Sequence, residues 1–397
     1  MTITAESRTS MAMLSDELLE QCRQRAPEYD RENRFFQEDF EALRDAGYTL
    51  MAVPEEFGGR GLKLDEAMRL TRRLAYYAPA DALALNMHVY WTGSAADVWR
   101  SGDKSVQWIL EEAGKGEIFA AGHAESGNDI PVLLSTSKAE RVDGGYRISG
   151  RKSFGSLTPV WTWLGVHAMD MSDPEHPKIV HSFMRRGSEG IRVIENWDVL
   201  GMRATQSHDT ELDNVFVADD RIARVLPAGA AGIDPWLLSV FVWALAGFAN
   251  VYYGLAQRAL DVTVEGIGKR KAIALPRGYA YHPEYQHAVA EMVTRIEAIG
   301  PHVETFAREW SEGVDHGMGW ATKLFAMKYH TVESAWEVVD SALELGGGFG
   351  IFRQSGLERM FRDARLGRIH PGNAFLTREF IGKLALGVDP DDPQRWG

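Results

Sequence analysis

His370, His88 and Ser156 are the side chains for which the sequence suggests chemistry. Histidine has an ordinary pKa of about 6.5, so an imidazole can donate or accept a proton at neutral pH. His370, which is followed directly by the inert ring of Pro371, is therefore one side chain that is chemically able to act as an acid or a base. Ser156 offers a hydroxyl that can hydrogen-bond a ligand. His88 follows the mostly apolar run 82–87 and could equally be a hydrogen-bonded core residue.

The composition narrows the classes of function. The chain has 397 residues, 45% hydrophobic and 25% charged, which is typical of two or three globular domains. Its net charge of -13 argues against a nucleic-acid partner. A single cysteine, Cys22, excludes an intrachain disulfide and a cysteine-based zinc site, and we expect no metal. The first residues lack a basic segment followed by an apolar run, so we expect a cytoplasmic protein with no membrane partner.

One segment, 235–257, contains no charged residue and is long enough to span a bilayer. It includes Ser239, Asn250 and two glycines, and Arg258 continues the same pattern beyond its end. A helix that is apolar on all sides is also what the centre of a helical bundle requires. We favour the buried helix over the membrane span.

The periodicity of apolar residues changes twice along the chain. Helical spacing in the first third predicts helices around 68–77 and 81–99, with a helix end at Gly47. Short β-like runs follow, including a hairpin with its turn at Asp143-Gly144-Gly145, and long helical stripes return after residue 232. We predict a mainly α protein with an N-terminal α-helical domain (1–117), a central β-barrel (118–228) and a C-terminal four-helix bundle (229–397).

Several short motifs occur in an order that resembles the acyl-CoA dehydrogenase superfamily, along residues 54–387. They include the loop Pro-Glu-Glu-Phe-Gly-Gly-Arg-Gly at 54–61, Gly-Arg-Lys-Ser-Phe-Gly-Ser at 150–156, Leu-Gly-Met-Arg at 200–203, and Gly-Gly-Phe-Gly at 347–350 before Arg362-Asp363. Each piece is short, but their order and spacing together are specific. The resemblance implies the fold predicted above and a flavin, FAD or FMN, between the central domain and the bundle.

The resemblance also implies particular contacts with that flavin. Ser156 occupies the place of the hydroxyl that bonds the N5 and O4 edge, and Trp163 lies near the isoalloxazine ring in the family. Arg270 falls where an arginine of a neighbouring subunit reaches the pyrophosphate. Gly347 and Gly348 would let the backbone approach the adenosine side. The alternative is that Ser156 and Arg270 are ordinary surface residues.

The chain departs from the family pattern where thioester chemistry occurs. The family places a tyrosine and its catalytic glutamate where this chain has His370 and Pro371. Some relatives carry the glutamate on the first bundle helix, where this chain has Ala244 and Leu245. The family loop Thr-Glu-Pro-Gly-Ala-Gly-Ser-Asp, which contacts acyl-CoA, is shortened and rearranged at 124–129.

At these divergent points the chain is similar to the two-component flavin monooxygenases of the same superfamily. They use reduced flavin from a separate reductase, and O2, to hydroxylate small aromatic or heteroatom substrates. This resemblance implies His370 as the acid or base, with Ser156 and His88 holding the oxygenated flavin, in a homotetramer or dimer. Two alternatives stay open, namely an acyl-CoA or acyl-carrier thioester dehydrogenase with an atypical base, and a non-catalytic subunit of a hetero-oligomer.

Overall fold

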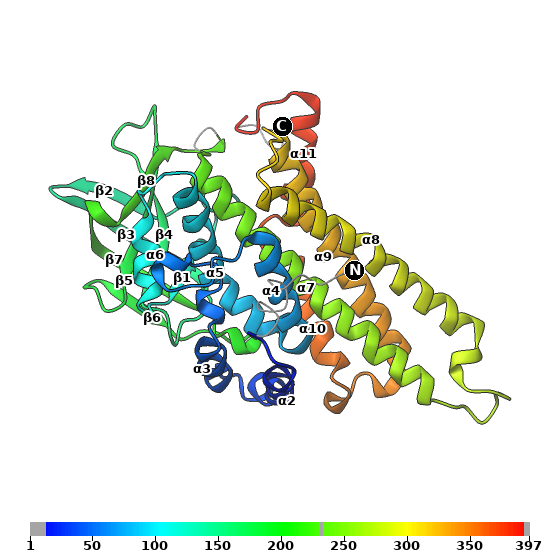
Figure 1. Cartoon of the computed structure of the whole chain (residues 1–397). Helices are drawn as coiled ribbons and strands as arrows, with labels where there is room; N and C mark the ends of the chain where they lie inside the picture. The colour runs from blue at the N-terminus through cyan, green and yellow to red at the C-terminus, as the bar shows by residue number, and fades with distance from the viewer. Residues whose placement is uncertain (1–12, 231–232, 393–397) are drawn as a thin grey trace.

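The computed structural model of the protein describes residues 13–230 and 233–392. Figure 1 shows the β-sheet at one end of the molecule and the long C-terminal helices at the other. The N-terminal helices are α2 (Asp16–Glu32), α3 (Gln37–Asp45), α4 (Leu64–Tyr77), α5 (Pro79–Arg100) and α6 (Gln107–Gly114). The strands are β1 (Phe119–Gly122), β2 (Lys138–Val142), β3 (Gly145–Gly155), β4 (Trp163–Asp170), β5 (Lys178–Arg185), β6 (Ile191–Ile194), β7 (His208–Ala218) and β8 (Ile222–Pro227). The C-terminal helices are α7 (Pro235–Lys269), α8 (Pro283–Ser311), α9 (Gly319–Gly346), α10 (Leu357–Gly367) and α11 (Ala374–Leu386).

The local signals in the sequence correspond to the observed ends of elements. Gly47 follows α3 with φ +89°, a backbone conformation that glycine adopts without strain, so the predicted helix end is confirmed. The predicted hairpin is also confirmed, because Val142 pairs with Gly145 across a two-residue turn whose Gly144 has φ +75°.

The predicted β-barrel is wrong. The sheet runs in the order β6-β7-β3-β2-β4-β5-β8, and within the described residues no ladder joins β6 to β8. β2 and β4 share a single residue pair, Lys138 with Met169, so the two halves of the sheet are only narrowly joined. Helices α5 and α6 pack against the sheet, since Trp91 of α5 contacts Phe183 of β5 and Trp108 of α6 contacts Trp163 of β4.

The uncharged segment forms the first part of α7 and lies inside the fold. By length and composition α7 could cross a membrane, but 83% of its most apolar 18-residue window is buried. It packs against α4 and α5 on one side and α9 on the other, so the prediction of a buried helix is confirmed. Helices α7 to α10 pack together and α11 lies on α9. The domain limits 117/118 and 228/229 stay predictions.

Candidate active site

His370 lies in the turn 367–372 between α10 and α11, against α7. The amides of Ile369 and His370 both donate to the carbonyl of Leu366, which continues the last turn of α10. The imidazole stacks on Phe248 of α7, with ring centroids 4.7 Å apart and an interplanar angle of 22°. Tyr252, one turn further along α7, is 5.8 Å away. The turn after α10 therefore holds the ring against Phe248 and Tyr252 of α7.

The surroundings keep this imidazole neutral. Its Nε2 is inaccessible and has no hydrogen-bond partner. Burial, and then the positive charge of Lys328, lower the pKa of His370 to about 3. This pKa lies far below the ordinary value of about 6.5, and the role of His370 as an acid or a base stays a prediction. At neutral pH the group is a polar, uncharged ring whose Nε2 is enclosed and left without a partner among the described residues.

No carboxylate stands beside this ring. Across residues 13–230 and 233–392, burial and Lys328 are the influences on the His370 pKa, and no acid contributes. The position of the alternative base on α7 is occupied by Ala244 and Leu245, and Leu245 lies against the turn near Gly372. Pro371 stands where the family places its catalytic glutamate, and no other acidic group among the described residues replaces that glutamate beside the His370 ring.

Ser156 lies at the end of β3, where the strand is irregular. The pairing of β3 with β7 shifts register between Lys152 and Gly155, a bulge that redirects the chain. The Ser156 hydroxyl is buried and lies 2.7 Å from that of Ser207, which in turn lies 2.7 Å from the Thr205 hydroxyl. Ser156 therefore belongs to a chain of three hydrogen-bonded hydroxyls. Hydrogen bonds in such a chain polarise one another, which would strengthen a hydrogen bond from Ser156 to a ligand at this edge of the sheet.

Phe154 is a residue that the sequence analysis missed. Its side chain is 59% exposed and its φ is +58°, an uncommon conformation for a bulky residue. Strained, exposed aromatic residues are concentrated at binding sites. The signal was available, because Phe154 lies inside the motif at 150–156, two residues before Ser156. Trp163, chosen instead, is buried between Trp108, Phe119 and two arginines, so it serves the core of the sheet domain.

His88 is fully engaged inside the core. Its Nε2 lies 2.8 Å from the Thr49 carbonyl, and its Nδ1 accepts the Phe119 amide at 3.1 Å. The amide donor requires an unprotonated Nδ1, so Nε2 carries the proton and donates to Thr49. Burial lowers the pKa of His88 to about 4. Both ring nitrogens are used by backbone, so His88 is not retained in the proposed site.

Arg270 and Gly347 meet at the far end of α7 and α9. Arg270 follows α7, donates to the Leu345 carbonyl and lies over the Tyr279 ring at 4.8 Å. Gly347 has φ +60°, and a Cβ added there would lie 3.4 Å from Arg270 Nη2, whereas one added at Gly348 would meet open space. Exposed apolar side chains surround this end of the chain, namely Phe349, Ile351 and Phe352. The Arg270 guanidinium could hydrogen-bond a phosphate here, because Gly348 leaves open space beside the turn.

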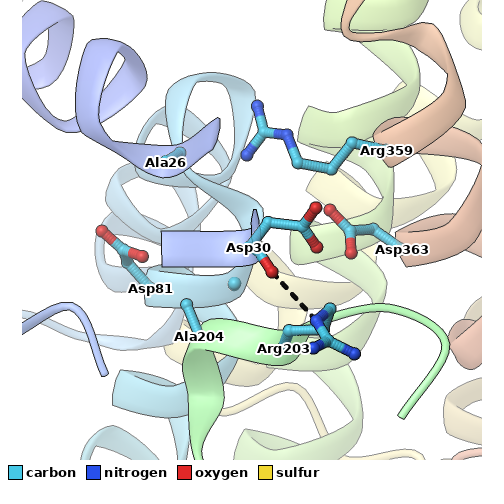
Figure 2. A pocket seen from close by; sticks show the side chains of 8 residues that line it. Ala26, Asp30, Asp81, Arg203, Ala204, Arg359 and Asp363 are labelled. Carbon is cyan, nitrogen blue, oxygen red and sulfur yellow. Dashed lines mark hydrogen bonds between the residues drawn. The ribbon is translucent and has the colours of Figure 1, made fainter. Parts of the chain in front are cut away.

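A second group of charged residues joins the N-terminal helices to α10. Figure 2 shows Asp30, Asp81, Asp363, Arg203 and Arg359 around a cavity of about 10 Å³, room for one water. Asp363 accepts the amide of Met202 at 2.5 Å. A larger opening of about 250 Å³ lies beside it. We interpret these residues as a joint between the N-terminal helices and α10.

Cys22, Asp39 and Asp81 also meet in the core, with potential ligand atoms within 4.8 Å of one another. Arg25 Nε lies 2.7 Å from Asp39 Oδ1 and supplies positive charge to this group. An ion pair therefore balances the Asp39 carboxylate.

Asp363, which lies between the N-terminal helices and α10, gives a test of how the stability of the protein depends on pH. Burial raises the pKa of Asp363 to about 6, against 3.8 for the ordinary side chain. A raised pKa means that the contribution of Asp363 to stability is present below about pH 4 and is lost as pH rises through 6. The loss is about 3 kcal/mol, from about two pKa units. We expect Asp363→Asn to remove this decline of the melting temperature between pH 4 and 7. The exposed Asp213→Asn is the control, and an unchanged decline in Asp363→Asn would contradict the assignment.

Two family models match the chain. The model of the acyl-CoA dehydrogenase N-terminal domain matches residues 4–106, and that of the acyl-CoA dehydrogenase C-terminal domain matches residues 238–386. Together they cover most of the helices before and after the sheet.

Individual proteins match over nearly the whole length. The chain is 27% identical to L-evernosamine nitrososynthase of a Micromonospora species, over 98% of this chain and 93% of that protein. It is 25% identical to cyclohex-1-ene-1-carbonyl-CoA dehydrogenase of Geobacter metallireducens, over 97% of this chain and 99% of that protein. The solved structure of KijD3 with FMN and dTDP-3-amino-2,3,6-trideoxy-4-keto-3-methyl-D-glucose is 25% identical, with a TM-score of 0.84 over 99% of this chain and 97% of that one.

Proposed function

Because the chain belongs to the acyl-CoA dehydrogenase superfamily, we propose that it is a flavin-dependent monooxygenase acting on a heteroatom or aromatic ring of a small substrate. Within that range we favour an amine nitrogen. A nitrososynthase is among its full-length relatives, and the KijD3 structure holds FMN together with an amino sugar. When bound, a reduced flavin supplies the two electrons that convert one atom of O2 to water while the other enters the substrate.

The observation that carries the proposal is the group at the turn after α10. Desaturation of a thioester needs a base that removes the α-proton. Pro371 has no titratable group, and His370 is a weak base because burial and Lys328 lower its pKa to about 3. A polar substrate group that reaches the enclosed Nε2 of His370 would be oriented by one hydrogen bond, because this nitrogen has no partner among the described residues. Phe248 holds the ring in one plane, which limits where that hydrogen bond can point.

The residues around the sheet edge and the far end of α7 suit a flavin. The exposed ring of Phe154 offers a flat apolar surface, and Ser156 offers a hydroxyl polarised by Ser207. Arg270 and the open turn at Gly347 suit a phosphate group. The exposed apolar residues near this turn support a homo-oligomer in which a neighbouring subunit completes the cofactor site. FAD and FMN both fit these features, and a separate reductase would supply the reduced form.

A thioester dehydrogenase is the second candidate, since a CoA-thioester dehydrogenase matches the chain over nearly its full length. Rapid mixing separates the two. We expect flavin-loaded protein, mixed anaerobically with a series of acyl-CoAs, to keep its oxidised absorption bands. We expect chemically reduced protein to be reoxidised by O2 with one oxygen atom recovered in an amine substrate, followed with ¹⁸O2 and mass spectrometry. Anaerobic bleaching of the flavin by an acyl-CoA would refute the monooxygenase proposal.

A further inference from the structure

Lys328 of α9 is a buried lysine with no role in the proposal so far. The residue is 1% exposed, and its neighbours on the same face, Leu324, Met327 and Val332, are buried as well. Lysine is almost never this buried unless polar partners receive its ammonium group. The partners of Lys328 therefore indicate what it does.

All three donors of this ammonium are directed at one turn. Lys328 Nζ lies 3.0 Å from the Gly372 carbonyl, 3.3 Å from the His370 carbonyl and 3.4 Å from the Gly367 carbonyl. Gly367 is the last residue of α10, where helix carbonyls lack partners and carry partial negative charge. One side chain thus joins the beginning, the middle and the end of the turn 367–372.

Other contacts also hold parts of the turn, because the Ile369 and His370 amides donate to the Leu366 carbonyl and Arg368 pairs with Glu333 of α9. Pro371 has no amide hydrogen to donate, and Gly372 adopts φ +70°, which few other residues accept. Thr377 of α11 donates to the Gly372 carbonyl at 3.0 Å, and Asn373 caps α11. These bonds fix the end of the turn. The carbonyl of His370 itself is bonded by Lys328.

We propose that Lys328 is a positioning residue, whose Nζ holds the turn 367–372 closed through its hydrogen bonds to backbone carbonyls and thereby sets the orientation of the His370 ring against Phe248. The importance of that orientation for turnover rests on the proposed function, whereas the structural role of Lys328 does not. Lys328 is inferred to act through His370 and is not assigned a contact with substrate.

The charge of Lys328 makes this role visible in a pH profile. The charged or titratable groups that interact with it are Glu333 on α9 and His370 on the turn. Arg368 in turn pairs with Glu333, and the Tyr252 ring on α7 lies 5.8 Å from the His370 ring. Burial lowers the pKa of Lys328 to about 7, while an opened turn would return it towards 10.5. The open form therefore binds the proton more tightly, and opening becomes less favourable as pH rises from 7, by about tenfold for each pH unit.

Hydrogen–deuterium exchange of the full-length purified protein tests the proposal without substrate. The readout is the peptide carrying the Ile369 and His370 amides, corrected for intrinsic exchange, between pH 7 and 9. We expect opening in the wild type to fall by about tenfold per pH unit. We expect Lys328→Met to exchange at least tenfold faster at pH 9 and to lose the pH dependence. Lys323→Met, on the same helix but paired with Glu309, is the matched control.

The outcomes are separable. Unchanged exchange and an unchanged pH slope in Lys328→Met would overturn the inference, whatever the protein oxidises. If Lys328→Met does not fold, Lys328→Gln retains two donors but no charge, so closure should survive while the pH slope disappears. A wild-type turn whose opening does not depend on pH would also overturn it. A failed oxygenation assay with these exchange results intact would count against the proposed function alone.

Discussion

Replacing His370 with alanine is expected to lower kcat by at least about 10²-fold while leaving flavin affinity nearly unchanged, as loss of one positioned hydrogen bond at a reacting group does. The ring is held by Phe248 and by the turn that Lys328 binds, and its Nε2 is left unused by the protein. Removing the ring leaves the backbone of the turn intact, because Lys328 contacts the His370 carbonyl and not the imidazole. The effect should therefore fall on substrate orientation.

The measurement is single turnover of reduced protein with O2 and an amine substrate, alongside flavin titration by fluorescence. The exposed His287→Ala on α8 is the control for loss of a histidine elsewhere in the bundle. Because burial and Lys328 lower the pKa of His370 to about 3, the wild-type kcat profile should show no imidazole inflection between pH 5 and 6.5. Unchanged turnover in His370→Ala would remove the ring from the mechanism.

Much of the fold could be predicted because its signals are local. The period of apolar residues located the helices at 68–77 and 81–99, and the two glycines after Asp143 marked the hairpin. Closure of the sheet could not be predicted in this way. Period-two alternation specifies the two faces of a strand, whereas closure depends on whether β6 and β8 meet, which is a contact between distant segments.

The roles of the candidate site residues stay predictions, and the structure places His370 after α10, Ser156 after β3 and Arg270 beside Gly347. Motif order alone selected these residues. It could not indicate that backbone groups use both nitrogens of His88, because Thr49 and Phe119 are distant in sequence. The pKa of an imidazole likewise depends on burial and on neighbours from other helices.

The loop 124–129, which departs from the family pattern, is held by a buried carboxylate. Its Glu125 side chain turns inward to Lys152 of β3, with Oε1 2.6 Å from Nζ, and both side chains are buried. The same carboxylate also accepts hydrogen bonds from Ser135, Thr136, Ser137 and Asn128. His167 and Lys152 hold the Glu125 pKa well below its usual range against the cost of burial. The loop is therefore tied to the sheet by a buried ion pair.

Glu125→Ala should accordingly destabilise the protein by about 3–5 kcal/mol, the cost of leaving one partner of a buried pair alone. Lys152, whose pKa burial already lowers to about 8, would retain the carbonyl of His167 as its acceptor and would lose its proton more easily. The measurement is the free energy of unfolding in urea at pH 7, with Glu140→Ala on the exposed face of β2 as the control.

The combined variant Glu125→Gln/Lys152→Met distinguishes a charge effect from a packing effect. It removes both charges and keeps similar volumes, so it should recover much of the stability that Glu125→Ala loses. The lowered pKa of Glu125 contributes stability above about pH 4.5, and this stability is lost as pH falls. The free energy of unfolding of the combined variant should therefore decrease less steeply at acid pH than that of the wild type. Equal losses in the single and combined variants would mean that the hydrogen bonds of the loop, and not the ion pair, hold this part of the sheet together.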